Sequence, residues 1–165
     1  MNLLLKMKDF PEGYRKNVAV IVRDPSNGKL LFCRRCDTDN WQFPQGGIDT
    51  GEDTTDAMFR ELYEEVGLGK EDINIVTTSK EWITYDIPTS IRSYVLGGKF
   101  KGQIQKWYFV DLISSKEKID LNLDTKPEFD TYEWVTYWYP LEKIIDFKKE
   151  AYRKVLTEFS EQMKK

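Results

Sequence analysis

Three glutamates in the middle of the chain have a spacing that could bind a metal ion. Glu61, Glu64 and Glu65 stand at i, i+3 and i+4, so in a helix their side chains share one stripe of its surface. Carboxylates on one stripe repel each other by about 0.2–0.5 kcal/mol per exposed pair. A cation with oxygen ligands would remove this repulsion, and Mg²⁺ or Mn²⁺ suits an all-oxygen site beside a phosphate. The spacing by itself is equally consistent with a solvated acidic helix face.

The composition limits which other chemistry is available. Histidine is absent from the 165 residues, so proton transfer must use carboxylates, lysine, tyrosine or metal-activated water. The formal net charge of −3 argues against a general binder of duplex DNA or of the RNA backbone, because such proteins are normally basic. Binding of one phosphorylated end needs only a few local cations, so that class of ligand stays open.

The chain has few features of a secreted or membrane protein. No stretch approaches the roughly 18 consecutive apolar residues of a membrane span. The leucines at 3–5 are followed at once by Lys6, which makes this run too short for a signal peptide. Cys33 and Cys36 form a C-x-x-C, but the sequence lacks the further ligands that a zinc site needs. We expect a cytoplasmic protein without a membrane partner, and we favour a monomer.

The pattern of elements predicts one domain, residues 1–165, with an α+β fold. β-type runs predict strands at 17–23, 29–35, 41–43, 73–87, 105–113 and 132–137, with a hairpin turn at 24–28 and a turn at 44–47. Helix signals predict a helix from Thr54 or Thr55 to Val66 that ends at Gly67, a helical turn at 141–145 and a final helix at 148–163. One central and one terminal helix among strands favour an α/β/α sandwich with a mixed sheet.

The residues around the acidic stripe extend it into a longer motif. Residues 46–68 read GGIDTGEDTTDAMFRELYEEVGL, which resembles the Nudix box: G, five residues, E, seven residues, R-E, an apolar residue, any residue, E-E, any residue, G and an apolar residue. Every defined position is filled, by Gly46, Glu52, Arg60, Glu61, Leu62, Glu64, Glu65, Gly67 and Leu68. A match at nine positions rarely arises by chance, so it favours the metal site over the solvated face.

The resemblance implies a loop–helix–loop whose carboxylates hold one or more divalent cations, Mg²⁺ or Mn²⁺, which bridge a diphosphate and activate water for attack on phosphorus. It gives Glu61 and Glu65 as direct metal ligands, and Glu64 as a further ligand or the general base. Glu61 and Glu64 are therefore the expected catalytic residues. A main-chain carbonyl at Gly46 or Gly47 is expected to complete the metal site.

The resemblance also assigns a structural role to two residues of the box. Glu52 and Arg60 are expected to form a buried pair that holds the helix against the preceding loop, as an outer layer of support for the metal ligands.

Other stretches resemble one group within the family, the bacterial RNA pyrophosphohydrolases, also described as dinucleoside polyphosphate hydrolases. They are WQFPQGG at 41–47, GQIQKWY at 102–108, PEFD at 127–130 and FKKEAYR at 147–153, and the similarity runs from about residue 13 to 159. It implies removal of pyrophosphate or phosphate from 5′-triphosphorylated or 5′-diphosphorylated RNA ends, which exposes the transcript to decay. Cleavage of diadenosine tetraphosphate to give ATP, and a non-catalytic nucleotide-binding module, stay open as alternatives.

This group resemblance adds residues outside the box. Glu128 stands where a distal loop supplies a further metal ligand. Four residues match positions near the phosphates, namely Arg15, Arg35, Gln45 and Lys148. Tyr85 matches a position near the first base. The expected partners are 5′-phosphorylated RNA ends or dinucleoside polyphosphates, and not duplex DNA. The loop at 91–101 departs from the group pattern, which bears on the preferred base.

Overall fold

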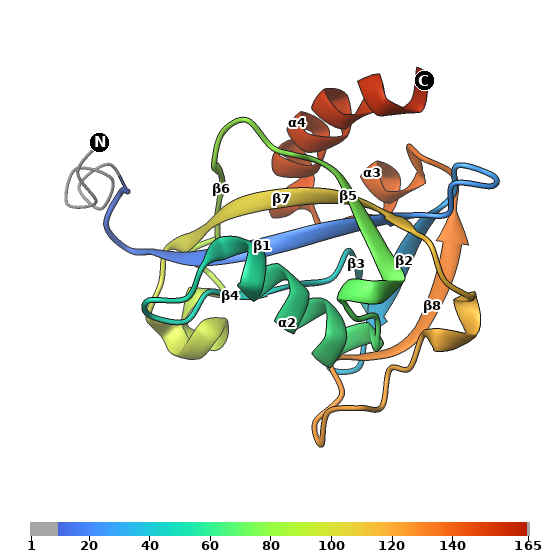
Figure 1. Cartoon of the computed structure of the whole chain (residues 1–165). Helices are drawn as coiled ribbons and strands as arrows, with labels where there is room; N and C mark the ends of the chain where they lie inside the picture. The colour runs from blue at the N-terminus through green and yellow to red at the C-terminus, as the bar shows by residue number, and fades with distance from the viewer. Residues whose placement is uncertain (1–9, 165) are drawn as a thin grey trace.

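A mixed eight-stranded sheet forms the centre of the computed structural model, which describes residues 10–164 (Figure 1). The leucine run interpreted above as too short for a signal peptide lies outside the described residues. Within residues 10–164, no helix has both the length and the apolar character that crossing a membrane requires.

The sheet is organised around two long strands that lie side by side. β1 (Tyr14–Arg23) and β7 (Gly102–Leu112) are parallel, with Tyr14 opposite Gly102 and Arg23 opposite Asp111. The other strands are β2 (Leu30–Arg35), β3 (Trp41–Gln42), β4 (Gln45–Gly47), β5 (Ile73–Thr78), β6 (Ile83–Asp86) and β8 (Phe129–Val135). β4 pairs with β1, β5 and β6 pair with β7, and β2 pairs with β1, β3 and β8. Every pairing except that of β1 with β7 is antiparallel, so the sheet is mixed.

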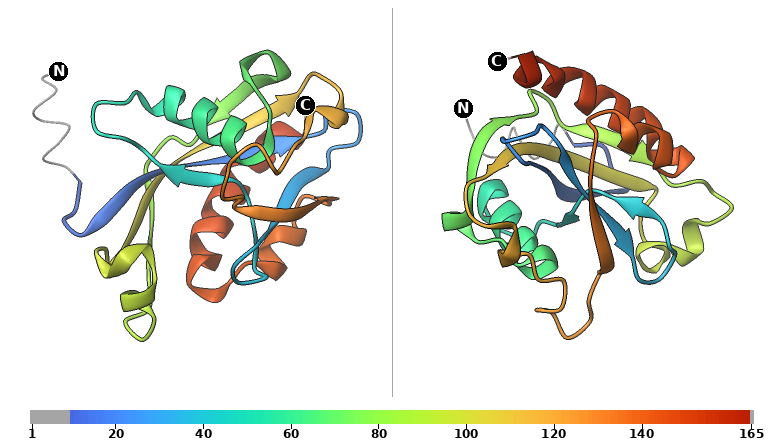
Figure 2. Two further views of the ribbon diagram at one scale, coloured as in Figure 1. Left: turned by 90° about the horizontal axis from the view of Figure 1, so that it is seen from below. Right: turned by 90° about the vertical axis from the view of Figure 1, so that its right-hand side faces the viewer.

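Helices cover both faces of this sheet (Figure 2). α2 (Thr54–Val66) packs on one face, where Met58, Leu62 and Val66 belong to one apolar core. α4 (Lys149–Phe159) packs on the other face, and its Tyr152, Val155, Leu156 and Phe159 belong to a second core. α3 (Tyr139–Lys143) precedes α4 and contacts it. The predicted α/β/α sandwich is therefore confirmed.

Local signals fix the ends of α2 where the sequence predicted them. The Asp53 side chain accepts the main-chain N–H groups of Thr55 and Asp56, which caps the first turn. Gly67 ends the helix at φ 80°, a left-handed conformation that glycine adopts without strain. These two ends set where the carboxylates of α2 lie along its axis.

Two predicted elements were wrong. The turn expected at 44–47 is instead β4, whose Gln45 and Gly47 lie opposite Ala19 and Asn17 of β1. The strand expected over 73–87 is two strands, β5 and β6. Thr78 lies opposite Tyr108 and Ile83 opposite Gln105, so residues 79–82 face only two residues of β7 and the regular pairing breaks there. At this break the main-chain N–H of Lys80 donates to the Glu158 side chain of α4, 3.3 Å away.

Candidate active site

A cavity of about 520 Å³ opens between α2, the two central strands and the loops that precede α4. This volume lies in the range of sites for small ligands. Nine residues predicted from the sequence line it together: Arg15, Arg35, Gln45, Gly46, Glu61, Glu65, Tyr85, Glu128 and Lys148. These come from segments up to 133 positions apart in the sequence, so only the fold brings them together.

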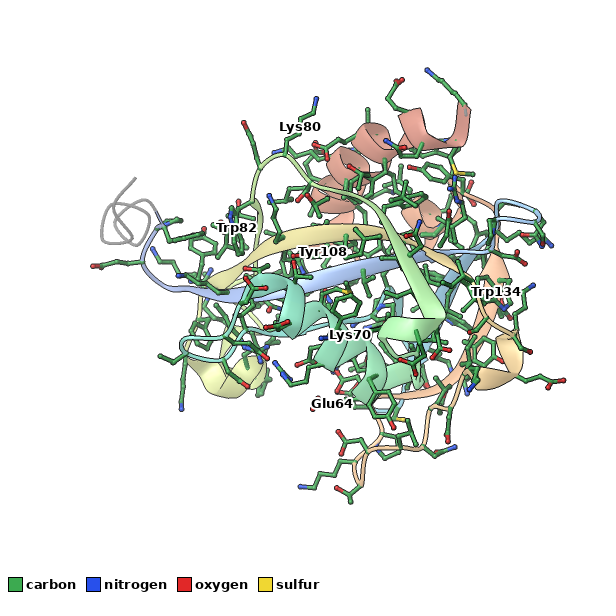
Figure 3. All side chains as sticks on the ribbon, viewed as in Figure 1. Glu64, Lys70, Lys80, Trp82, Tyr108 and Trp134 are labelled. Atoms are coloured by element: carbon green, nitrogen blue, oxygen red, sulfur yellow. The ribbon has the colours of Figure 1, made fainter. Side chains whose placement is uncertain are left out.

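Three predicted residues lie outside this lining. Glu64 projects from the surface of α2, and 44% of its side chain is exposed (Figure 3). Glu52 and Arg60 form the expected pair, with Arg60 Nε 2.8 Å and Nη2 2.9 Å from the two Glu52 oxygens. The pair is partly exposed, however, and not buried as predicted, because 18% of the Glu52 side chain and 29% of the Arg60 side chain are accessible. Of the two residues expected to be catalytic, the structure therefore brings Glu61 to the cavity and leaves Glu64 beside it.

Arg60 connects β4 and the loop that follows it with the acidic helix α2. Besides Glu52, it donates to the Gly47 carbonyl at 2.9 Å, to Glu61 at 2.9 Å and to Glu64 at 3.4 Å. Its hydrogen bonds to Glu52 lower the pKa of that carboxyl to about 2. Arg60 thus relieves part of the repulsion between the helix carboxylates and fixes α2 against the loop at Gly47.

Glu61 lies against the main chain of Gly46. A Cβ at residue 46 would overlap the Glu61 carboxylate and force it to move, so glycine allows the carboxylate to keep this position. Burial raises the pKa of Glu61, and the adjacent Arg60 acts in the opposite direction. The first glycine of the motif is therefore explained by the room that the Glu61 carboxylate needs.

Glu65 is the most deeply buried carboxylate of the site, with 8% of the residue exposed. Its pKa is raised well above the ordinary value, first by burial and then by the nearby charges of Glu61 and Glu128. Its Oε2 atom has no hydrogen-bond partner within the described residues. A buried, unpartnered carboxylate oxygen beside two other carboxylates has the chemistry of a cation ligand.

Two of the carboxylates around the cavity, Glu61 and Glu128, are paired with arginines. Arg60 holds Glu61, and Arg35 Nη1 lies 3.1 Å from Glu128 while the same guanidinium also binds Asp37. Accordingly, no three acidic side chains among residues 10–164 converge into a ready-made metal-binding group. The oxygen ligands for a divalent cation are present at one cavity, but Glu61 and Glu128 must turn from their arginines to share it.

Cationic side chains line the same cavity. A Cβ at Gly47 would overlap the Arg15 guanidinium, so Arg15 lies directly over this part of the Nudix loop. Lys148 is buried, and its Nζ donates to Gln42 Oε1 at 3.0 Å. Burial, together with the positive charge of Arg35, lowers the pKa of Lys148 to about 8.

Sequence reasoning missed several lining residues. Asn17, Gln42 and Gln103 are buried polar side chains within strands, and none was singled out. Their signal was a polar residue in an otherwise apolar β-type run, which needs a partner when the strand is buried. The loop at 91–98 adds Ile91, Tyr94, Val95 and Leu96 to the wall.

The sandwich fold and the carboxylates of a loop–helix–loop facing a cationic cavity define a Nudix domain. The NUDIX domain family model matches residues 13–159. The chain is 43% identical over 148 residues to the RNA pyrophosphohydrolase of Baumannia cicadellinicola subsp. Homalodisca coagulata, which covers 90% of this chain and 92% of the relative. The RNA pyrophosphohydrolases of Shewanella piezotolerans and Vibrio cholerae are 44% and 41% identical, each over 90% of this chain and 86% of the relative. The chain belongs to the Nudix family, in the group of the bacterial RNA pyrophosphohydrolases.

Solved structures with lower sequence identity share the fold. The E. coli dihydroneopterin triphosphate pyrophosphohydrolase superposes with a TM-score of 0.68 at 19% identity, over 89% of this chain and 99% of that chain. A C. elegans Ap4A hydrolase superposes with a TM-score of 0.62 at 17% identity, over 87% and 98%. At these identities the likeness concerns the fold alone.

Proposed function

We propose that this protein is an RNA 5′ pyrophosphohydrolase, which removes pyrophosphate from 5′-triphosphorylated ends, or phosphate from 5′-diphosphorylated ends, and so triggers RNA decay. The observation that carries the proposal is the 41–44% identity to proteins named RNA pyrophosphohydrolase over nine-tenths of the chain. The cavity supports it, because it combines carboxylates with three cationic side chains.

A divalent cation fits the residues of this site. Glu61, Glu65, Glu128 and the main-chain carbonyl of Gly46 would hold it, since Mg²⁺ and Mn²⁺ prefer oxygen ligands. When bound, the cation would withdraw electron density from phosphorus and lower the pKa of water. We assign acceptance of the water proton to Glu61 in preference to Glu64, because Glu61 lines the cavity and Glu64 does not.

The cationic residues bind and orient the phosphate chain in this mechanism. Arg15, Arg35 and Lys148 neutralise the charge of the phosphate oxygens and hold the scissile anhydride beside the carboxylates. The Glu52–Arg60 pair keeps α2 in register with the loop, so that the carboxylates of the helix stay at the correct distance.

Dinucleoside polyphosphate cleavage is the less favoured alternative. The likeness to an Ap4A hydrolase has 17% identity, whereas the likeness to RNA pyrophosphohydrolases exceeds 40%. A non-catalytic module is disfavoured because all carboxylates of the box are present. We further propose that the enzyme acts in the cytoplasm, where its two free cysteines would stay reduced and RNA 5′ ends occur. A monomer remains our prediction.

A comparison of substrates tests this function. Purified protein should hydrolyse 5′-triphosphorylated RNA with a higher kcat/KM than diadenosine tetraphosphate, in Mg²⁺ or in Mn²⁺. Glu61→Gln should lower kcat by orders of magnitude, whereas Glu133→Gln, at an exposed glutamate of β8, should leave it unchanged. Turnover of diadenosine tetraphosphate or ADP-ribose without turnover of RNA would refute the proposal.

A further inference from the structure

Amide side chains form part of the cavity wall, and their orientation is fixed from behind. Asn17, Gln42 and Gln45 line the cavity, and Gln105 lies behind them, fully buried on β7. None of the nine defined positions of the Nudix box falls on these four residues, and of the four only Gln45 matched a position near the phosphates in the sequence. Their hydrogen bonds decide whether the cavity meets amide oxygens or amide N–H groups.

Trp107 sets the direction of this network. Its indole N–H can only donate, and it lies 3.1 Å from Gln105 Oε1. Gln105 Nε2 must therefore face the other way, where it donates to Asn17 Oδ1 at 2.9 Å and to Gln45 Oε1 at 3.0 Å. Both accepting amides consequently have their carbonyl oxygens turned back toward Gln105 and their NH₂ groups turned away from it.

Lys148 fixes the orientation of the Gln42 amide in a similar way. Its ammonium group can only donate, and it donates to Gln42 Oε1 at 3.0 Å. The Gln42 NH₂ group is therefore the free end of that side chain. Gln103 is different, because its neighbour, the Tyr85 hydroxyl at 2.5 Å, can either donate or accept.

Two of these amide nitrogens have no acceptor. Asn17 Nδ2 and Gln42 Nε2 are buried, yet neither has a hydrogen-bond partner within the described residues, nor has the amide oxygen of Gln103, Oε1. Buried donors are almost always paired in proteins, because an unpaired one is destabilising. Both belong to residues that line the cavity, although the two nitrogen atoms themselves are covered, so an acceptor must reach into this wall to complete their hydrogen bonds.

We propose that Asn17 and Gln42 donate these N–H groups to phosphate oxygens of the substrate. Gln105 is then a positioning residue, because it keeps the NH₂ groups of Asn17 and Gln45 turned away from itself and toward the cavity. The inference rests on the proposed function and names the part of the substrate that this wall binds. A phosphate chain at neutral pH offers almost only acceptor oxygens, which suit two unpaired N–H donors. Arg15, Arg35 and Lys148 in the same cavity also favour an anion.

Single-atom replacements test the donors directly. Gln42→Glu and Asn17→Asp each exchange the free NH₂ for oxygen while keeping the acceptor for Lys148 or Gln105. Each should weaken binding of inorganic pyrophosphate, and raise KM for 5′-triphosphorylated RNA, by about tenfold or more. Binding of the same RNA with a 5′-hydroxyl should change little. Gln42→Met, which adds no charge, should have a smaller effect in the same direction.

Gln105 tests the positioning role, because it does not line the cavity. Gln105→Glu keeps the hydrogen bond from Trp107 but presents a carboxylate oxygen to Asn17 and Gln45. Both amides should therefore flip by about 180°, so that their NH₂ groups face residue 105. We expect KM for 5′-triphosphorylated RNA to rise by about tenfold with a smaller change in kcat. Gln105→Met, which breaks the bonds without reversing them, should raise KM less.

Ser114→Ala provides the matched control, because Ser114 Oγ is also a buried atom without a partner but lies outside the cavity lining. It should leave pyrophosphate affinity and KM unchanged. Unchanged pyrophosphate affinity in folded Gln42→Glu and Asn17→Asp would refute the inference, as would an equal loss for 5′-hydroxyl RNA. Wild-type protein that binds pyrophosphate but does not hydrolyse RNA would refute the proposed function alone.

Discussion

Replacing Glu52 by glutamine tests whether the pair with Arg60 stabilises the fold through charge. Arg60 lowers the pKa of Glu52 from 4.5 to about 2. This difference corresponds to about 3 kcal/mol at 1.36 kcal/mol per pH unit. Because 18% of the Glu52 side chain is exposed, solvent screening reduces our expectation to about 2 kcal/mol. At pH 7, Glu52→Gln should therefore lower the free energy of unfolding by about 2 kcal/mol, and Tm by about 4–8 °C.

The pH dependence of this loss follows from the direction of the pKa change. A carboxyl with a lowered pKa in the folded state contributes its full stabilisation above 4.5 and loses it as the pH falls toward 2. The difference between wild type and Glu52→Gln should shrink by about a quarter or more at pH 4 and by more than half at pH 3. Urea denaturation at pH 7, 4 and 3 measures it, with Glu133→Gln as the exposed control. A difference that is the same at all three pH values would refute the electrostatic explanation.

The same substitution should also change the metal dependence of catalysis. Without the charge of Glu52, Arg60 is free to bind Glu61 and Glu64 more strongly, which it already contacts at 2.9 and 3.4 Å. Glu61 then becomes a poorer ligand, so the Mg²⁺ concentration for half-maximal activity should rise several-fold, and excess Mg²⁺ should restore turnover. A destabilised variant with unchanged Mg²⁺ dependence would show that the pair acts on the fold alone.

Three further outcomes are expected. Lys148 should lose its charge as the pH rises through about 8, so kcat/KM for 5′-triphosphorylated RNA should fall above that pH, and Lys148→Arg, which stays charged, should lack this fall in a pH profile. Tyr152→Phe should lower the free energy of unfolding by about 1–3 kcal/mol in urea denaturation, because the Tyr152 hydroxyl accepts the buried N–H of Phe43 at 2.9 Å; an unchanged midpoint would contradict this role. Adding Mg²⁺ to protein stripped with EDTA should raise Tm, and Glu65→Gln should reduce that rise; equal rises in both proteins would mean that Glu65 is not a ligand.

The sequence predicted the acidic helix well because its signals are local. Asp53 caps α2, Gly67 ends it, and the apolar residues between them repeat with the period of a helix. The strands around 44–47 and 73–87 were predicted less well. A three-residue strand such as β4 depends on its partner β1, and the break between β5 and β6 depends on the register of their partner β7. Neither partner is near in sequence, so no local pattern indicates them.

By itself, the sequence determined the class of chemistry, because the nine defined positions of the Nudix box lie within 23 consecutive residues and need only a loop and a helix to act together. The tertiary structure decided which carboxylates share the cavity. Glu64 and Glu65 differ by 100° around α2, and the docking of that helix on the sheet turns Glu65 inward and leaves Glu64 at the surface. The tertiary structure also decided the orientation of the Asn17 amide. The indole N–H of Trp107 can only donate, so it fixes the orientation of Gln105, which in turn donates to Asn17 Oδ1.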